Sequence, residues 1–171
     1  VLEELRTKGW VQWIGASTYG VEATAEGIGC GRCDCLQVAC SALDRRNEAD
    51  IWQAARSGGI GIVARSVLLK GVLTPRYAYL PDSLAELKSA ASELTSLAEQ
   101  AGITLPELAY RYILSRDVPH SALVGASNVS ELEAAVAFAE AGPLPADLEA
   151  RVRRVGVANE RLLNPGTWGI G

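Results

Sequence analysis

The feature that most constrains the fold is a regular alternation of short apolar runs with amphipathic segments along the 171 residues. Four apolar runs have the length expected of strands. They are residues 10–17, 34–43, 60–66 and 121–127. The third run is apolar on both faces, which is typical of a strand in a parallel sheet covered by helices. The alternation therefore predicts an α/β fold with four parallel strands joined by right-handed crossovers.

Helical periodicity lies between and after these runs. Residues 82–101 carry a buried stripe at helical spacing, and residues 1–9 have the features of the end of a helix. Ser83 with Glu86, and Thr104 with Glu107, predict capping boxes at two helix starts. The remaining predicted helices are 47–59, 105–116, 127–142 and 147–160.

Composition narrows the functional classes. The formal net charge is −4 and no basic cluster is present, which argues against nucleic acid as a partner. No apolar run reaches the ~18 residues of a membrane helix. We expect no membrane association and, with free thiols and no recognisable signal peptide, a cytoplasmic location.

Four segments resemble, in order and spacing, signature segments of the aldo-keto reductases. They are "WIGASTYG" (13–20), "DCLQVACSALDRR" (34–46), "GIGIVARSVLLKGVLT" (59–74) and "VPHSALVGASNVSELEAAV" (118–136). The resemblance implies a (β/α)8 TIM barrel that binds a nicotinamide cofactor at the carboxyl ends of its strands. The chain would supply only the C-terminal half, strands five to eight. Residues 1–171 would form a single (β/α)4 half-barrel unit with helices outside the sheet.

The resemblance places no catalytic residue in this chain. The family's catalytic Tyr, Asp, Lys and His belong to the first half of the barrel and have no counterpart here, so activity would need that half. His120, the only histidine, matches none of them, and we expect it to be a surface or rim residue.

The resemblance assigns cofactor roles to two strand ends. Gln37 and Ser17 match residues that hold the nicotinamide carboxamide, and Thr18 stands where the family has Asn. Gln suits this role because its amide both donates and accepts hydrogen bonds. A second set matches the segment around the pyrophosphate, where backbone amides can hold phosphate oxygens. That set is Arg65, Ser66, Leu68, Lys70 and Gly71.

The adenosine end departs from the family pattern. Gly125 and Ser127 are kept, but no Lys or Arg occurs from residue 120 to 150. Glu131 stands near the position where a 2′-phosphate would be neutralised. A carboxylate there repels a phosphate and accepts hydrogen bonds from a free ribose hydroxyl. The sequence therefore favours NAD over NADP, although NADP binding through other residues or a weakened cofactor site stays open.

The four cysteines lie within residues 30–40. A metal site needs thiolates that converge on one point. The resemblance puts residues 34–41 on a strand, where alternation would turn Cys35 and Cys40 to opposite faces. We therefore expect no bound metal. Cys30 and Cys33 could pair under oxidation.

Half of a barrel would leave two open sheet edges and an uncovered, apolar inner face. We therefore expect a complementary barrel half, supplied by a separate chain, a second copy or a segment absent from this sequence. The helix end at Val1 is consistent with a cut within a longer protein.

Three functions stay open. The first is an NAD(P)-dependent oxidoreductase that acts on a small carbonyl compound or alcohol, with this chain as its cofactor-binding half. The second is a non-catalytic subunit of the same fold that serves binding or regulation. The third is a thiol or metal module at residues 30–40.

Overall fold

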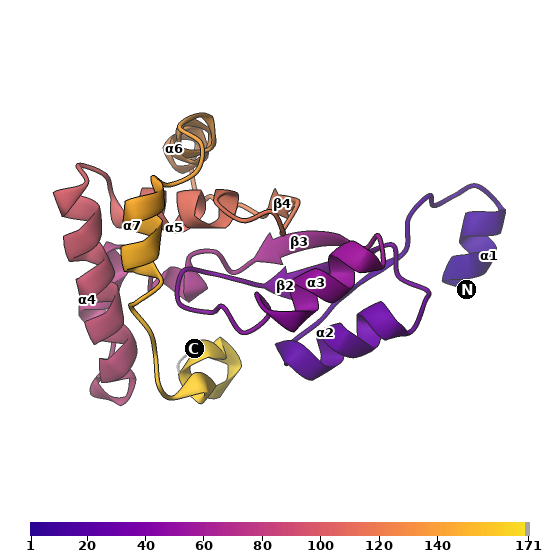
Figure 1. Ribbon diagram of the computed structural model, residues 1–171, viewed down its shortest axis with the longest axis horizontal. Helices are drawn as coiled ribbons and strands as arrows, with labels where there is room; N and C mark the ends of the chain where they lie inside the picture. The colour runs from indigo at the N-terminus through magenta and orange to yellow at the C-terminus, as the bar shows by residue number, and fades with distance from the viewer. Residues whose placement is uncertain (170–171) are drawn as a thin grey trace.

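The computed structural model describes residues 1–169 and confirms an α/β fold built on one parallel sheet. The last two residues of the predicted unit 1–171 lie outside the described residues. The sheet has the order β1-β2-β3-β4, and every neighbouring pair is parallel (Figure 1). Its strands are β1 (Gly15–Ser17), β2 (Cys35–Ala39), β3 (Gly61–Arg65) and β4 (Ser121–Ala122).

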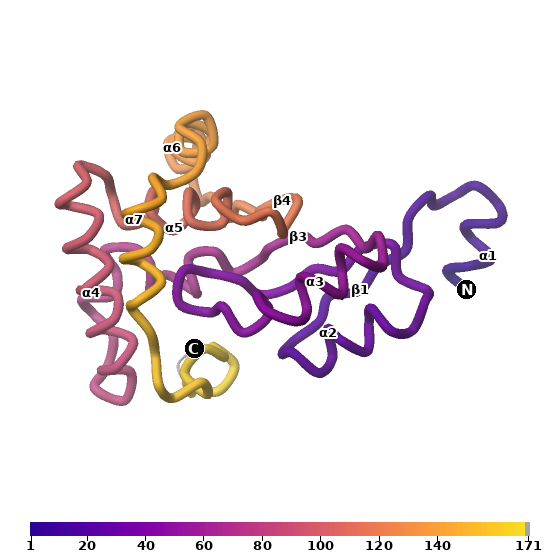
Figure 2. Tube along the Cα trace, in the orientation of Figure 1, coloured from indigo at the N-terminus to yellow at the C-terminus, as the bar shows by residue number. Residues whose placement is uncertain are grey.

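Seven α-helices are present in residues 1–169, and Figure 2 traces their connections. α1 lies at one end of the molecule, α4 lies at the other, and α2 and α3 run along one side of the sheet (Figure 1). None of the described helices is long and apolar enough to cross a membrane. The helices are α1 (Leu2–Thr7), α2 (Gly20–Gly29), α3 (Asp50–Ser57), α4 (Ala85–Gln100), α5 (Leu105–Leu114), α6 (Val129–Glu140) and α7 (Ala146–Val152). The short 3₁₀ turns are η1 (Leu69–Gly71), η2 (Pro75–Tyr79), η3 (Asp82–Leu84), η4 (Glu160–Leu163) and η5 (Pro165–Thr167).

The two faces of the sheet differ in chemistry. Leu36 and Val38 of β2, and Ile62 and Ala64 of β3, are almost fully buried in the core. Because strand side chains alternate, the other face carries the intervening residues. Those are Gly15, Ser17, Cys35, Gln37, Ala39, Gly61, Val63, Arg65 and Ser121. The expectation of an apolar inner face was therefore wrong, because the large aliphatic side chains of β2 and β3 point toward the helices.

Several predicted elements differ in length from those in the structure, and one helix was not predicted. β1 and β4 are shorter than predicted because each lies at an edge and has one hydrogen-bonded neighbour. α7 ends at Val152, well before residue 160. No helix was predicted between the first two strands, because α2 is rich in glycine and buries only Thr24.

Of the two predicted capping boxes, one is present in part, because the Glu107 carboxylate pairs with Arg111. The Thr104 hydroxyl accepts a hydrogen bond from the amide of Glu107 at 3.2 Å. Ser83 does not cap α4, because the 3₁₀ turn η3 takes up residues 82–84 and α4 begins at Ala85. Glu86 instead accepts hydrogen bonds from the amides of Ala158 and Asn159, which ties α4 to the segment after α7.

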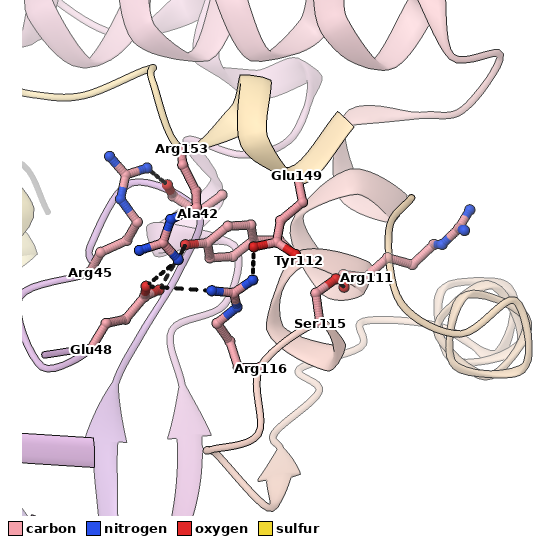
Figure 3. Close-up of polar contacts among 9 residues, drawn as sticks. All are labelled: Ala42, Arg45, Glu48, Arg111, Tyr112, Ser115, Arg116, Glu149 and Arg153. Carbon is pink, nitrogen blue, oxygen red and sulfur yellow. Dashed lines mark hydrogen bonds and ion pairs between the residues drawn. The ribbon is translucent and has the colours of Figure 1, made fainter. Parts of the chain in front are cut away.

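A partly buried ionic network joins the loop after β2 to α5 and α7 (Figure 3). Glu48 is its centre: one carboxylate oxygen accepts from the Tyr112 hydroxyl at 2.7 Å, and the other from Arg153 at 2.8 Å. Arg116 lies 3.9 Å from Glu48 and also pairs with Glu149. Burial and the neighbouring Glu48 carboxylate raise the pKa of Tyr112, so this hydroxyl stays protonated and donates. The network holds the loop against the helical layer.

We expect Glu48→Gln to lower the free energy of unfolding by about 2 kcal/mol, because two arginines lose their shared carboxylate. The loss should stay below the ~3–5 kcal/mol typical of a fully buried pair, since the side chain of Arg153 is 43% exposed. Urea denaturation measures it. Glu133→Gln on the exposed face of α6 is the matched control and should change stability by less than about 0.5 kcal/mol. Equal losses in the two variants would contradict the role of Glu48.

Candidate functional site

The parallel register brings the predicted nicotinamide residues together. Ser17 on β1 is the direct neighbour of Gln37 on β2, and Gln37 pairs with Val63 on β3. Because all four strands run in the same direction, their carboxyl ends share one edge of the sheet, where open α/β sheets bind their ligands. The side chains of Ser17 and Gln37 lie on the face opposite to the buried core.

Ser17 and Gln37 form a direct hydrogen bond. The Ser17 hydroxyl donates to Oε1 of Gln37 at 3.3 Å. The backbone carbonyl of Gln37 accepts a hydrogen bond from the amide of Thr18 at 3.0 Å, which extends the β1–β2 ladder past the end of β1. The Ser17 bond uses one of the two lone pairs on Oε1, so the carboxamide keeps capacity for a ligand that both donates and accepts.

Thr18 faces away from that pair. Its hydroxyl lies 2.9 Å from the Thr24 hydroxyl, and Thr24 donates to the carbonyl of Gly20 at 2.7 Å. Thr24 has only one proton, so Thr18 is the donor between the two threonines. Thr18 is buried and fixes the first turn of α2. Its role toward a cofactor stays a prediction, and while the hydroxyl donates to Thr24 it can only accept a hydrogen bond from a ligand.

Arg65 links the ends of β1 and β3 across β2. Its guanidinium donates to the carbonyl of Thr18 at 2.8 Å and to the Ser66 hydroxyl at 3.2 Å. It also lies over the ring of Tyr19, 4.7 Å from the ring centroid, in cation–π geometry. Tyr19 was not among the residues predicted from the sequence, although it directly follows Ser17 and Thr18.

The loop after β3 has an unusual backbone. Ser66, Leu69 and Lys70 have positive φ values of 60°, 45° and 52°, which non-glycine residues adopt rarely and at a cost. Gly71 follows with a φ of 90°. Leu69 is buried and holds the loop in the core. Turns with left-handed residues bind phosphate through their amides in many proteins. In this loop the amides of Leu69 and Gly71 donate to the carbonyls of Ser66 at 2.8 Å and Leu68 at 2.9 Å.

The predicted adenosine residues form a separate group after β4. Glu131 accepts a hydrogen bond from the amide of Ser127 at 2.7 Å, while Asn128 caps α6 by accepting from the amide of Glu131 at 3.0 Å. Glu131 therefore takes part in a capping arrangement at the start of α6 that the sequence analysis missed. Gly125 lies between β4 and this cap, and a Cβ there would meet no atom within 4 Å.

His120 lies at the opposite edge of the sheet. His120 directly precedes β4, and its Nδ1 accepts a hydrogen bond from the amide of Ile62 in β3 at 3.0 Å. It thus satisfies a backbone group at the amino end of the strands, away from the carboxyl ends that carry Ser17 and Arg65.

The cysteines do not form a metal centre in the part of the chain that is described. No group of three or more His, Cys, Asp or Glu side chains within residues 1–169 is placed to hold a metal ion. All four cysteines are free thiols, from exposed Cys30 to buried Cys40.

The model of the aldo/keto reductase family matches residues 1–156, so the chain belongs to this family of oxidoreductases. It is 26% identical to the NADH-specific methylglyoxal reductase of Escherichia coli (strain K12) over 80% of its length and 46% of the relative. It is also 26% identical to an aldo-keto reductase of Pseudocercospora fijiensis (strain CIRAD86), over 86% of its length and 60% of the relative.

Solved structures give the same result for the fold. The holo form of the aldo-keto reductase AKR11C1 from Bacillus halodurans superposes with a TM-score of 0.75 at 27% identity. The superposition covers 90% of this chain and 53% of that one, and the apo form gives the same score. The chain thus spans about half the length of the proteins it matches, and its four strands are part of a (β/α)8 barrel.

We expect Arg65→Met to lower the free energy of unfolding by about 1–2 kcal/mol. The Thr18 carbonyl loses a charged donor, worth ~1.5–3 kcal/mol when buried and less at a partly exposed site. Urea denaturation followed by circular dichroism measures the change. Arg56→Met removes only an exposed ion pair with Asp117 and should be nearly neutral. If both variants kept wild-type stability, Arg65 would not link the strand ends.

Proposed function

We propose that the chain is the cofactor-binding half of an NAD(P)-dependent oxidoreductase that interconverts carbonyl compounds and alcohols. The observation that carries the proposal is the hydrogen-bonded pair of Ser17 and Gln37 at the carboxyl edge of a parallel sheet. A bound nicotinamide supplies or accepts the hydride. Ser17 and Gln37 would bind its carboxamide and so decide which face of the ring meets the substrate.

The rest of the site would hold the remainder of the cofactor. The loop from Ser66 to Gly71 would lie against the phosphates, with Arg65, Leu68 and Lys70 beside them. The amides of Leu69 and Gly71 already donate within the loop, so they are not counted among the phosphate donors. Gly125, Ser127 and Glu131 would meet the adenosine end. Glu131 still carries a negative charge after capping α6, which favours a ribose hydroxyl over a 2′-phosphate. The NADH-specific reductase among the relatives supports the same preference.

The other half of the barrel would complete the enzyme. We propose that it supplies the proton donor and packs against the two open edges of the sheet. Apolar side chains are exposed near both edges: Trp10 and Trp13 precede β1, and α6 presents an apolar stripe after β4. That stripe is Val129, Leu132 and Val136, which are 71%, 50% and 51% exposed.

A non-catalytic subunit of the same family is the second candidate. Two observations favour it: the Thr18 hydroxyl is engaged by Thr24, and the Glu131 carboxylate is engaged by Ser127. Both residues would then serve the fold rather than a cofactor. The two candidates differ in whether the assembled barrel oxidises NADH in the presence of a small aldehyde.

Cofactor binding can be measured by titrating the assembled barrel with NADH and NADPH and following tryptophan fluorescence. We expect tighter binding of NADH. Gln37→Ala should weaken both cofactors about tenfold, which corresponds to ~1.4 kcal/mol and one lost bond to the carboxamide.

A charge-reversal variant tests whether Glu131 sets the preference for NADH over NADPH. Glu131→Lys should shift preference toward NADPH, whereas Glu133→Lys, a change of the same charge two residues along α6, should not. Tighter NADPH binding by the wild type would overturn the NAD preference. If the wild-type barrel bound neither NADH nor NADPH, the non-catalytic candidate would be favoured.

A further inference from the structure

A pair of thiols lies outside the candidate cofactor site. The loop between α2 and β2, at the amino end of the sheet, contains Cys30, Gly31, Arg32 and Cys33. The two sulfur atoms are 3.9 Å apart. Cys30 is exposed and Cys33 is partly buried, so Cys30 is the more accessible of the two to reagents in solution.

The loop has room to close a bond. A disulfide needs a sulfur separation of about 2.0 Å, so the two atoms must approach by roughly 2 Å. Gly31 has a φ of +65°, and a Cβ built on it would meet no atom within 4 Å. The backbone at Gly31 therefore has space to move, whereas Cys33 packs against the core, so the exposed Cys30 side is the one with room to approach.

The two thiols differ in reactivity. The backbone amide of Arg32 is the largest cause that lowers the pKa of Cys30, and hydrogen bonds from the Cys33 side chain and amide and the Arg32 charge lower it further. Burial raises the pKa of Cys33, and its contacts with Cys30 add to the effect. The thiolate is the attacking species, so Cys30 should react first.

The other two cysteines are poorly placed to compete. Cys40 is 1% exposed, and burial raises its pKa far above that of a free thiol. The sulfur of Cys35 lies only 2.5 Å from the position that a Cβ on Gly15 would take, so it packs against the backbone of β1. Cys30 and Cys33 are therefore the reactive pair.

We propose that Cys30 and Cys33 are a redox-active dithiol that forms a reversible intramolecular disulfide. The Cys30 thiolate attacks one sulfur of a low-molecular-weight disulfide, forms a mixed disulfide and releases one small thiolate. The Cys33 thiolate then attacks Cys30 Sγ and releases the second. Two electrons pass from the protein dithiol to the external disulfide, and the two thiol protons pass to solvent.

The pair adjoins a junction that holds the amino-terminal segment. Asp34, next to Cys33, accepts hydrogen bonds from the amide of Ile14 at 2.8 Å and from Arg6 of α1. Oxidation would thus act at the α1–β1–β2 junction, at the edge of the sheet opposite to Ser17 and Gln37. The proposal does not depend on the proposed function.

The sequence makes the bond easy to map, because trypsin cleaves after Arg32, between the two cysteines. Cys30 then falls in the fragment 9–32, and Cys33 falls in 33–45 together with Cys35 and Cys40. The chain is incubated with glutathione disulfide, alkylated, digested without reduction and analysed by mass spectrometry. We expect the two fragments to be linked and to separate after dithiothreitol.

Three variants assign the roles. Cys35→Ser should keep the link between the fragments, and Cys33→Ser should leave glutathione on Cys30. Cys30→Ser should lose the link and react with glutathione disulfide at least about tenfold more slowly. The proposal would be overturned if the wild-type fragments stayed unlinked, or if the link survived in Cys33→Ser but not in Cys35→Ser.

Discussion

The parallel hydrogen-bond ladder of the sheet is the constraint on which the rest of the structure depends. β1 and β3 both pair with β2, so their register against β2 fixes how the carboxyl ends of these three strands line up. That register puts Ser17 beside Gln37 and lets Arg65 reach the carbonyl of Thr18 across the intervening strand. A slip of one residue would exchange the two faces of a strand, and would turn Gln37 into the apolar core.

The ladder also explains why the molecule has two chemically distinct surfaces. Alternation sends Leu36, Val38 and Ile62 under the helices and leaves mainly small and polar residues, with Val63, on the opposite face. Exposing an inner face of this kind to water costs less free energy than exposing the aliphatic face that we expected. The proposal of a complementary half rests instead on the edges of the sheet, where β1 and β4 each have a neighbouring strand on one side only, and on the exposed apolar side chains beside them.

The sequence predicted those parts of the fold whose pattern is set by burial. β2 and β3 carry dense apolar runs and lie where they were expected, and the strong stripe of α4 marked its helix correctly. The errors fall where local composition carries little information. α2 is built from glycine, alanine and small polar residues, so its period is weak, and Ser83 resembled a cap although η3 intervenes.

The candidate site shows the same division. The contact between Ser17 and Gln37 follows from strand order and register, which sequence patterns can indicate. The positions of the Thr18 hydroxyl and the Glu131 carboxylate do not follow from either. Each has a nearby hydrogen-bond partner, Thr24 in one case and the amide of Ser127 in the other, that only three-dimensional structure reveals. A residue type at a family position therefore indicates a role, whereas its local partners decide how available the side chain is.

Sedimentation velocity over a range of concentrations tests the central claim most directly, that these four strands are an incomplete ring in need of further strands. The 18.1 kDa chain should self-associate when it is alone, and should give way to a single larger species when the complementary barrel half is added. A homogeneous 18.1 kDa monomer at all concentrations, unchanged by the complementary half, would contradict the account.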